Sequence, residues 1–265
     1  MSTVVVQDDL GAVVELKRPV RRVISLVPSL TEAVAESDRS LLVGATDWCT
    51  HPVLDVPRVR GTKNPNVAAI TQLRPDLVLA NQEENRAIDV DRLRNQGIAV
   101  WVTKIESVDE ALSSMTRLFA EGLGLGEPEW LSEAKTVWAD VVPAPARKVV
   151  IPIWRDPWMV VGRDTFTGDL ARRLGYDCVH AARDERYPKV SEAELNEGID
   201  LAILPDEPYV FTETDGPEAF PGLPVALVDG RSLTWYGPSL RNAPQRIQNA
   251  VSRAHTKWGG REHGK

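Results

Sequence analysis

The chain has 265 residues, of which 43% are hydrophobic and 26% are charged, and its net charge is −7. This balance is typical of a soluble globular protein with one or two domains, and the lack of a basic stripe argues against nucleic-acid binding. The two cysteines, Cys49 and Cys178, form no C-x-x-C pair, which argues against a disulfide framework and a paired zinc motif. No apolar run reaches the roughly 18 residues that predict a membrane span.

The first hundred residues alternate between predicted strands and helices. A hairpin is expected around Asp8-Asp9-Leu10-Gly11, and the pattern that follows is typical of an α/β sheet. Ser29 and Glu32 have the spacing of a capping box, which predicts a helix start directly after the first buried strand. Buried strands are predicted at 22–27, 41–46, 76–80 and 98–102, and helices at 67–73 and 88–96.

The stretch 107–142 contains two predicted helices with no strand between them. Ser107 and Glu110 form a predicted capping box, and Pro128 suits the first turn of the second helix. Pro143 stops that helix, which would be roughly 20 Å long at 1.5 Å per residue. We interpret the stretch as a strut between two α/β lobes. The alternative is an ordinary helix pair inside one large domain.

The second half of the chain repeats the pattern of the first. The Pro65-x-Val and Asp76-Leu motifs recur at Pro188 and Asp200, which are 123 and 124 residues later. A near-constant offset indicates duplication, although two unrelated βαβ segments can also look alike. Strands are predicted at 148–151, 200–204 and 225–228, and helices at 165–174, 191–196 and 238–254. The expected organisation is an N-terminal lobe at 1–106, a helical linker at 107–146, a C-terminal lobe at 147–256 and a frayed tail at 257–265.

Aromatic and amide side chains follow the predicted strands in both halves. In parallel sheets the ligand crevice lies at the carboxyl ends of the strands, so these side chains are expected to face a cleft. Such a surface suits a large, flat, partly apolar ligand with amide groups on its rim; alternatively, half of these residues only pack. The excess of tryptophan, eight against four Phe and four Tyr, fits this interpretation. The candidate ligand-binding residues are Ser29, Trp48, Thr62, Asn81, Gln82, Trp154, Trp158, Tyr187, Trp235 and Tyr236.

Catalytic and metal-binding patterns are sparse. The sequence has no G-x-S-x-G, H-E-x-x-H or phosphate-loop motif, so no catalytic residue is assigned. His51 and His180 could meet as metal ligands, but a lone loop histidine is more often plain polar surface, and no metal site is assigned. Four arginines could instead bind an anionic chelate, although scattered arginines are usually solvated: Arg155, Arg183, Arg186 and Arg231.

Several motifs together resemble the class III periplasmic binding proteins, the helical-backbone receptors for cobalamin, haem and ferric siderophores. The resemblance covers roughly residues 4 to 250 and is strongest in the Pro28-Ser29-x-Thr31-Glu32 and Pro75-Asp76-Leu77-Val78 motifs. Trp48 before His51-Pro52, and Tyr187-Pro188-x-Val190-Ser191, are most similar to the cobalamin-binding branch. The resemblance implies an α/β protein with two Rossmann-like lobes and mainly parallel sheets, a single bridging helix, and a ligand between the lobes. It also implies that aromatics at Trp48 and Tyr187 line a corrin site.

The sequence departs from the family at the positions used for transport. Members that deliver to a permease carry a docking glutamate on each lobe, where this chain has Ala68 and Ala193. Neighbouring carboxylates are poor substitutes, because one residue along a helix turns a side chain by about 100°. No signal peptide or lipobox is recognised, and two free thiols fit a reducing compartment.

We therefore expect a non-enzymatic corrinoid-binding protein with cobalamin as its probable ligand, cytoplasmic and not coupled to an importer. One alternative is a ferric-siderophore or haem solute-binding protein of an ABC importer, which would be favoured if Arg155, Arg183 and Arg231 converge. Another is an enzyme acting on a corrinoid-like ligand, which would require a nucleophile and base in one site.

Overall fold

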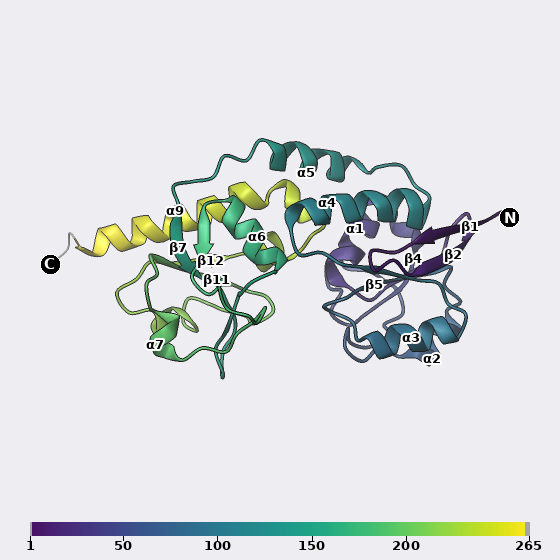
Figure 1. Ribbon diagram of the computed structural model, residues 1–265, viewed down its shortest axis with the longest axis horizontal. Helices are drawn as coiled ribbons and strands as arrows, with labels where there is room; N and C mark the ends of the chain where they lie inside the picture. The colour runs from purple at the N-terminus through teal and green to yellow at the C-terminus, as the bar shows by residue number, and fades with distance from the viewer. Residues whose placement is uncertain (1, 263–265) are drawn as a thin grey trace. The chain divides into compact units, whose positions relative to one another are not determined.

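The computed structural model describes residues 2–262, and the chain divides into two compact units (Figure 1). Unit 1 comprises Met1–Ile105, Asp109–Lys135 and Tyr236–Pro238, and unit 2 comprises Glu106–Val108, Thr136–Trp235 and Ser239–Lys265. Among the described helices, none combines the length and the hydropathy that a membrane crossing requires. The boundaries expected for a separate linker at 107–146 remain a prediction.

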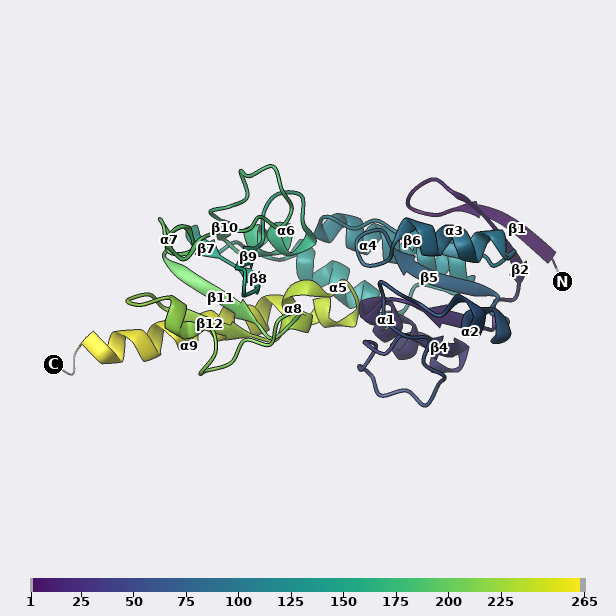
Figure 2. The ribbon, with the colours of Figure 1, turned by 90° about the horizontal axis from the view of Figure 1, so that it is seen from below.

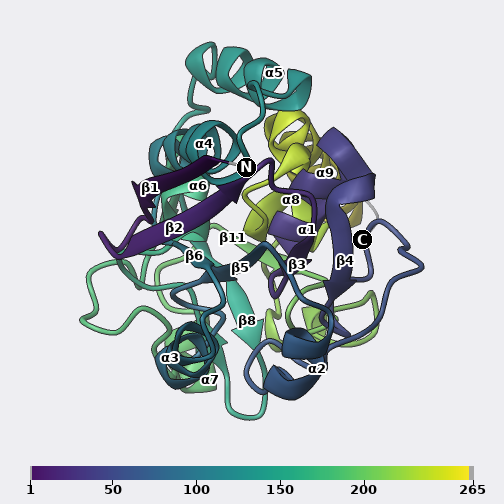
Figure 3. The ribbon, with the colours of Figure 1, turned by 90° about the vertical axis from the view of Figure 1, so that its right-hand side faces the viewer.

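The core of unit 1 is a parallel sheet whose strands are almost wholly buried. Its strand order is β4-β3-β5-β6. Helices α2 and α3 lie on one face of the sheet, and α1 and α4 on the other (Figures 1 and 3). The elements are β3 (Val23–Ser25), α1 (Pro28–Asp38), η1 (Arg39–Leu41), β4 (Leu42–Ala45), α2 (Val67–Gln72), β5 (Leu77–Asn81), α3 (Ala87–Asn95) and β6 (Val100–Thr103).

The expected N-terminal hairpin is present as β1 (Ser2–Gln7) paired antiparallel with β2 (Val13–Arg18). The buried carboxylate of Asp8 closes the turn of this hairpin and also binds the hairpin to helix α3. Oδ1 of Asp8 accepts the backbone N–H groups of Leu10 and Ala12 at 3.0 and 2.9 Å. Its Oδ2 accepts from the Arg94 guanidinium at 2.7 Å.

The helices that follow β6 and precede β7 in the chain are shorter than the sequence suggested. Helix α4 (Val108–Arg117) continues into a π-helical turn, η2 (Leu118–Leu123), and α5 (Glu129–Ala139) follows. The π-helical turn was not predicted, and it is capped by Gly124 in the left-handed conformation, with φ of 70°. The Arg18 side chain donates to the Gly122 carbonyl at 3.0 Å and also to the Glu121 carbonyl, which stabilises this wider turn.

Unit 2 contains a second parallel sheet, with the order β10-β7-β11-β12. The antiparallel pair β8–β9 lies beside β11 (Figure 2). The sequence analysis did not predict the edge strand β10. The elements are β7 (Arg147–Val150), β8 (Pro152–Trp154), β9 (Met159–Val160), α6 (Phe166–Arg173), β10 (Tyr176–Cys178), α7 (Glu192–Leu195), β11 (Leu201–Pro205), η3 (Pro217–Ala219), β12 (Val225–Val228), α8 (Gly230–Thr234), η4 (Pro238–Arg241) and α9 (Ala243–Glu262).

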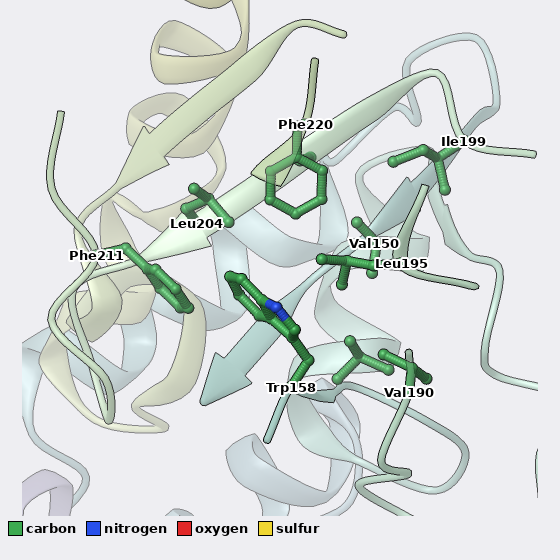
Figure 4. Packing of buried hydrophobic residues seen from close by; sticks show 10 residues of the cluster. Val150, Trp158, Val190, Leu195, Ile199, Leu204, Phe211 and Phe220 are labelled. Carbon is green, nitrogen blue, oxygen red and sulfur yellow. The ribbon is translucent and has the colours of Figure 1, made fainter. Parts of the chain in front are cut away.

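Helix α9 extends to Glu262, into the range expected to be a frayed tail, and 263–265 lie outside the described residues. On one face of the sheet of unit 2 lie α6, α8 and α9 (Figure 3). The other face carries an aromatic and aliphatic core around Trp158, Phe211 and Phe220 (Figure 4). Phe211 and Phe220 come from the chain between β11 and β12, and Trp158 comes from the turn between β8 and β9.

The two sheets share one topology, in which the second strand of each pairs with the first, followed by the third and fourth. Their registers correspond as well: Val23 pairs with Leu77 in unit 1, and Val149 pairs with Leu201 in unit 2. These partners are offset by 126 and 124 residues, as the sequence motifs are. The structure therefore supports duplication, and the predicted α/β fold with two parallel-sheet lobes is confirmed.

The repeated Asp-Leu motif has the same physical role in both sheets, which we call the aspartate clasp. Asp76 donates its N–H to the Arg22 carbonyl at 2.7 Å, and its Oδ2 accepts the Arg22 N–H at 2.9 Å. Asp200 forms the same two bonds with Lys148, also at 2.7 and 2.9 Å. Each clasp fixes the register of the two central strands at their entry, because a shift by one residue would break both bonds.

We predict that Asp76→Ala and Asp200→Ala each lower the free energy of unfolding by about 1–2 kcal/mol, since each leaves backbone donors without their charged acceptor. Asparagine at either position keeps an acceptor oxygen and should cost about half as much. Urea denaturation measures the change, with Asp55→Ala in an exposed loop as the control. A large loss in one clasp variant and none in the other would contradict their equivalence.

Candidate functional site

The carboxyl ends of the parallel strands form one edge of each sheet, and the candidate residues are assigned to these edges unit by unit. Ser29, Trp48, Thr62, Asn81 and Gln82 belong to unit 1. Tyr236 is also assigned to unit 1, although it lies far along the chain. Trp154, Trp158, Tyr187 and Trp235 belong to unit 2.

Trp48 lies in a rigidly built loop that follows β4, and its side chain is 67% exposed. The Arg58 guanidinium holds this loop by donating to the carbonyls of Thr46 at 3.0 Å, Cys49 at 2.9 Å and Leu54 at 3.2 Å. Cys49 is buried next to Trp48, and burial raises the pKa of its thiol, so it is a packing residue. The loop therefore presents a flat indole surface to solvent without needing a ligand to order it.

Asn81, in contrast, uses its side chain to build the loop after β5. Its Oδ1 accepts the Glu83 N–H at 2.8 Å, and its Nδ2 donates to the Thr103 hydroxyl at 3.1 Å. Asn85 extends the network by donating to the Thr62 carbonyl at 2.9 Å. Asn81 is 3% exposed, so its amide orients the backbone of this edge, while the neighbouring Gln82 is exposed.

The predicted capping box at Ser29 and Glu32 is absent, which corrects the sequence interpretation. Helix α1 begins at Pro28, its N-cap is Val27, and no side chain caps it. Ser29 and Glu32 are instead buried within the first turns of the helix. Tyr236 is also buried and donates from its hydroxyl to Glu84 at 3.2 Å. Burial raises the pKa of Tyr236 well above its usual value, so it stays a neutral donor.

An aromatic cluster follows the central strands of unit 2. Trp154 is 45% exposed, and Tyr209 packs edge-on against it at 5.6 Å between ring centroids. Phe211 lies 4.7 Å from Tyr209 and stacks on Trp158, with 4° between the ring planes. Trp158 is buried in the core, so only Trp154 and the half-buried Tyr209 offer aromatic surface. Tyr209 and Phe211 were missed, although the same rule applies because they follow β11.

Trp235 is fixed by a side-chain hydrogen bond, and Tyr187 is fixed by the backbone bonds of its neighbours. Trp235 is 7% exposed and donates its indole N–H to Glu207 at 2.7 Å. Burial raises the pKa of Glu207, and the bond from Trp235 acts against this rise. Tyr187 is half-buried in a segment fixed by backbone bonds on both sides, from Gly162 N–H to the Arg186 carbonyl and from Val160 N–H to the Pro188 carbonyl.

The four arginines proposed for an anionic chelate each interact with a protein group. Arg183 donates to Glu194 at 2.5 Å, and Arg186 donates to Glu106 at 2.6 Å. The bonds from Ser191 and then from Arg183 lower the pKa of Glu194 to about 2. Arg231 lies 5.4 Å above the Trp235 ring, and Arg155 binds Asp215 and Glu218.

The histidines form no metal centre that the structure describes. Within residues 2–262, no group of three or more His, Cys, Asp or Glu side chains is arranged to hold an ion. His51 is exposed in unit 1. His180, in unit 2, is buried, and burial lowers the pKa of its imidazole.

Ala68 and Ala193, where docking glutamates were expected, are both exposed on short helices. Ala68 lies in α2, whose N-cap Asn66 accepts from Ala69 N–H. Ala193 lies in α7, where Ser191 and Glu194 form a capping box. Glu194 is thus occupied in capping the helix and in binding Arg183.

No family model matches the chain. An uncharacterized ABC transporter substrate-binding lipoprotein of Bacillus subtilis is 27% identical over 82% of this chain and 70% of the relative. A vitamin B12-binding protein of Pectobacterium carotovorum is 23% identical over 86% of this chain and 87% of the relative. A vitamin B12-binding protein of Vibrio cholerae is 29% identical, over 38% of this chain and 37% of the relative.

Solved structures show the same fold. The periplasmic vitamin B12-binding protein of Vibrio cholerae has a TM-score of 0.71 at 19% identity, over 89% of this chain and 98% of that chain. A periplasmic heme-binding protein of a Roseiflexus species has a TM-score of 0.75 at 18% identity, over 89% and 99%. CeuE of Helicobacter pylori has a TM-score of 0.78 at 17% identity, over 97% and 90%.

These relatives correct one expectation and support another. The cytoplasmic assignment is wrong, because the relatives are periplasmic proteins or a lipoprotein of ABC transport. They are binding proteins and not enzymes, in agreement with the non-enzymatic reading. The chain is a relative of the class III periplasmic binding proteins, both in its two-lobed parallel α/β fold and in its sequence likeness to ABC substrate-binding and vitamin B12-binding proteins.

Proposed function

We propose that this protein is a solute-binding protein for a corrinoid of the cobalamin type, with exposed aromatic side chains in each unit available to the ligand. The observation that carries the proposal is the distribution of tryptophan. Of the seven tryptophans whose side chains are described, five are buried, and only Trp48 and Trp154 are exposed. The two exposed indoles belong to different units: Trp48 follows β4 of the parallel sheet in unit 1, and Trp154 ends β8, the short strand that follows β7 in unit 2. Leaving two indoles in water is unfavourable, so a flat apolar ligand is a plausible reason for it.

The alternative ligands are less well supported by the charges. A ferric siderophore or a haem with free carboxylates would be favoured by a convergent group of arginines. Arg155 and Arg183 are each bound to carboxylates instead, and Arg231 lies over Trp235. An enzymatic role finds no support among the relatives, which are binding proteins.

The relatives also support a place of action outside the cytoplasm. Their descriptions are those of periplasmic proteins and of a lipoprotein that works with an ABC transporter. We therefore extend the proposal to capture of the ligand on the outer side of the cytoplasmic membrane.

We expect purified protein to bind cobalamin or cobinamide with micromolar or tighter affinity, because macrocycle faces and amide rims suit exposed indoles and backbone groups. Isothermal titration calorimetry with both compounds measures this directly. Heat from a ferric siderophore, together with none from either corrinoid, would reject the corrinoid assignment.

Trp48→Ala and Trp154→Ala should each weaken corrinoid binding by about tenfold, through lost stacking and lost apolar contact, without lowering the melting temperature appreciably. Calorimetry and thermal melts measure the two effects. Val142→Ala removes a more exposed apolar side chain elsewhere in unit 2 and serves as the control. Unchanged affinity in both tryptophan variants would show that the ligand binds elsewhere.

A further inference from the structure

We infer that the carboxyl edge of unit 2 selects its ligand by charge, because Asp215 and Glu218 neutralise Arg155. A flat neutral or cationic molecule is accepted, and a flat molecule with free carboxylates is rejected. This inference rests on the proposed function for the location of the ligand. It adds the chemical class of molecule that the site takes and the residues that decide it.

Arg155 lies against the aromatic cluster, and its Nη1 is directed at protein carboxylates. It follows β8, and its guanidinium lies 5.0 Å from the centroid of the Trp158 ring. Nη1 of Arg155 donates to Glu218 at 2.7 Å and to Asp215. A third carboxylate, Asp156, lies 3.8 Å from Nε. Three negative charges around one positive charge leave a local charge of −2.

The two carboxylates that bind Arg155 are ionised at neutral pH. The hydrogen bond from Tyr209 and the Arg155 guanidinium lower the pKa of Asp215. Burial alone would raise the pKa of Glu218, but the bonds from Arg155 and from the Gly216 N–H outweigh it and lower that pKa. The bond to Glu218 in turn raises the pKa of Arg155 and keeps it charged. Arg155, Asp215 and Glu218 therefore stay charged over the physiological pH range.

This group adjoins the aromatic surface that the proposal assigns to the ligand. Asp215 accepts the Tyr209 hydroxyl at 2.7 Å, and the Tyr209 ring packs against the exposed Trp154. A molecule lying on Trp154 would therefore meet the carboxylates of Asp215 and of Asp156, whose side chain is 91% exposed. Placing like charges together disfavours the wrong ligand, and binding sites use such repulsion to achieve specificity.

Haemin and haemin dimethyl ester provide the test, because they share one macrocycle and differ only in whether the two propionates carry charge. Absorbance titrations of the wild-type protein should give a dissociation constant about tenfold lower for the ester than for haemin. The variant Asp215→Asn/Glu218→Gln removes the two negative charges that neutralise Arg155. The new amide oxygens can still accept from the Tyr209 hydroxyl and the Gly216 N–H. It should bind haemin about tenfold more tightly than wild type does and leave the ester within about threefold.

Asp164→Asn/Asp184→Asn is the matched control. These carboxylates bind a different guanidinium, Arg163, at 3.0 and 2.9 Å, so the control makes the same change in net charge away from the aromatic cluster. It should leave both dissociation constants unchanged. Thermal melts check that all variants fold, and Glu218→Gln alone provides a milder variant with a smaller gain for haemin.

The outcomes separate this inference from the proposed function. Equal wild-type affinity for haemin and its ester, or no gain for haemin in Asp215→Asn/Glu218→Gln, would overturn the charge selection. A gain for haemin alone, in a protein that binds neither cobalamin nor cobinamide, would support charge selection and reject the corrinoid function. Binding of neither haemin nor ester to any variant would reject the charge selection along with the ligand surface.

Discussion

The structure depends on the aspartate clasps that fix the two central strands in each sheet. Asp76 and Asp200 each bind both the N–H and the carbonyl of the residue that opens the neighbouring strand. With the register fixed at the entry, the carboxyl ends of the strands are aligned at the opposite edge. Most candidate binding residues lie in loops or helices that follow one of those ends, so an error in register would displace them together.

The loops on these edges are stabilised by protein groups and not by a ligand. In unit 1, Arg58 binds three carbonyls of the Trp48 loop, and Asn81 closes the loop after β5. In unit 2, the indole of Trp235 is occupied by Glu207. Trp48 and Trp154 keep exposed aromatic faces, which our proposal assigns to the ligand.

In our proposal, charge at the carboxyl edge of unit 2 selects the ligand. Arginine is often an anion-binding residue, and the sequence contains several near the strand ends. Arg155, Arg183 and Arg186 all donate to carboxylates of the protein. Since a guanidinium that is already paired gains little from a second anion, the presence of these arginines does not indicate an anionic ligand.

The sequence by itself determined the elements that rest on local or periodic signals. The buried strands, the hairpin at Asp8-Asp9-Leu10-Gly11 and the parallel lobes follow from apolar periodicity and turn residues, and the repeated Asp-Leu motif indicated the shared topology. The bonds from Leu10 and Ala12 to Asp8 are local, so the turn motif carries that role, whereas the clasps of Asp76 and Asp200 join residues 54 and 52 positions apart, and only the repetition of the motif pointed to them. The aromatic residues that follow strands were identified as a class for the same reason.

Only the tertiary structure decided which members of that class are exposed. Trp154 and Trp158 are four residues apart and chemically identical, yet one is 45% exposed and the other is stacked on Phe211 in the core. The capping box expected at Ser29 was absent because helix α1 begins at Pro28, which buries that serine. The partners of Arg155 lie 60 and 63 residues away along the chain. Burial and ion pairing depend on such long-range contacts, and no local pattern records them.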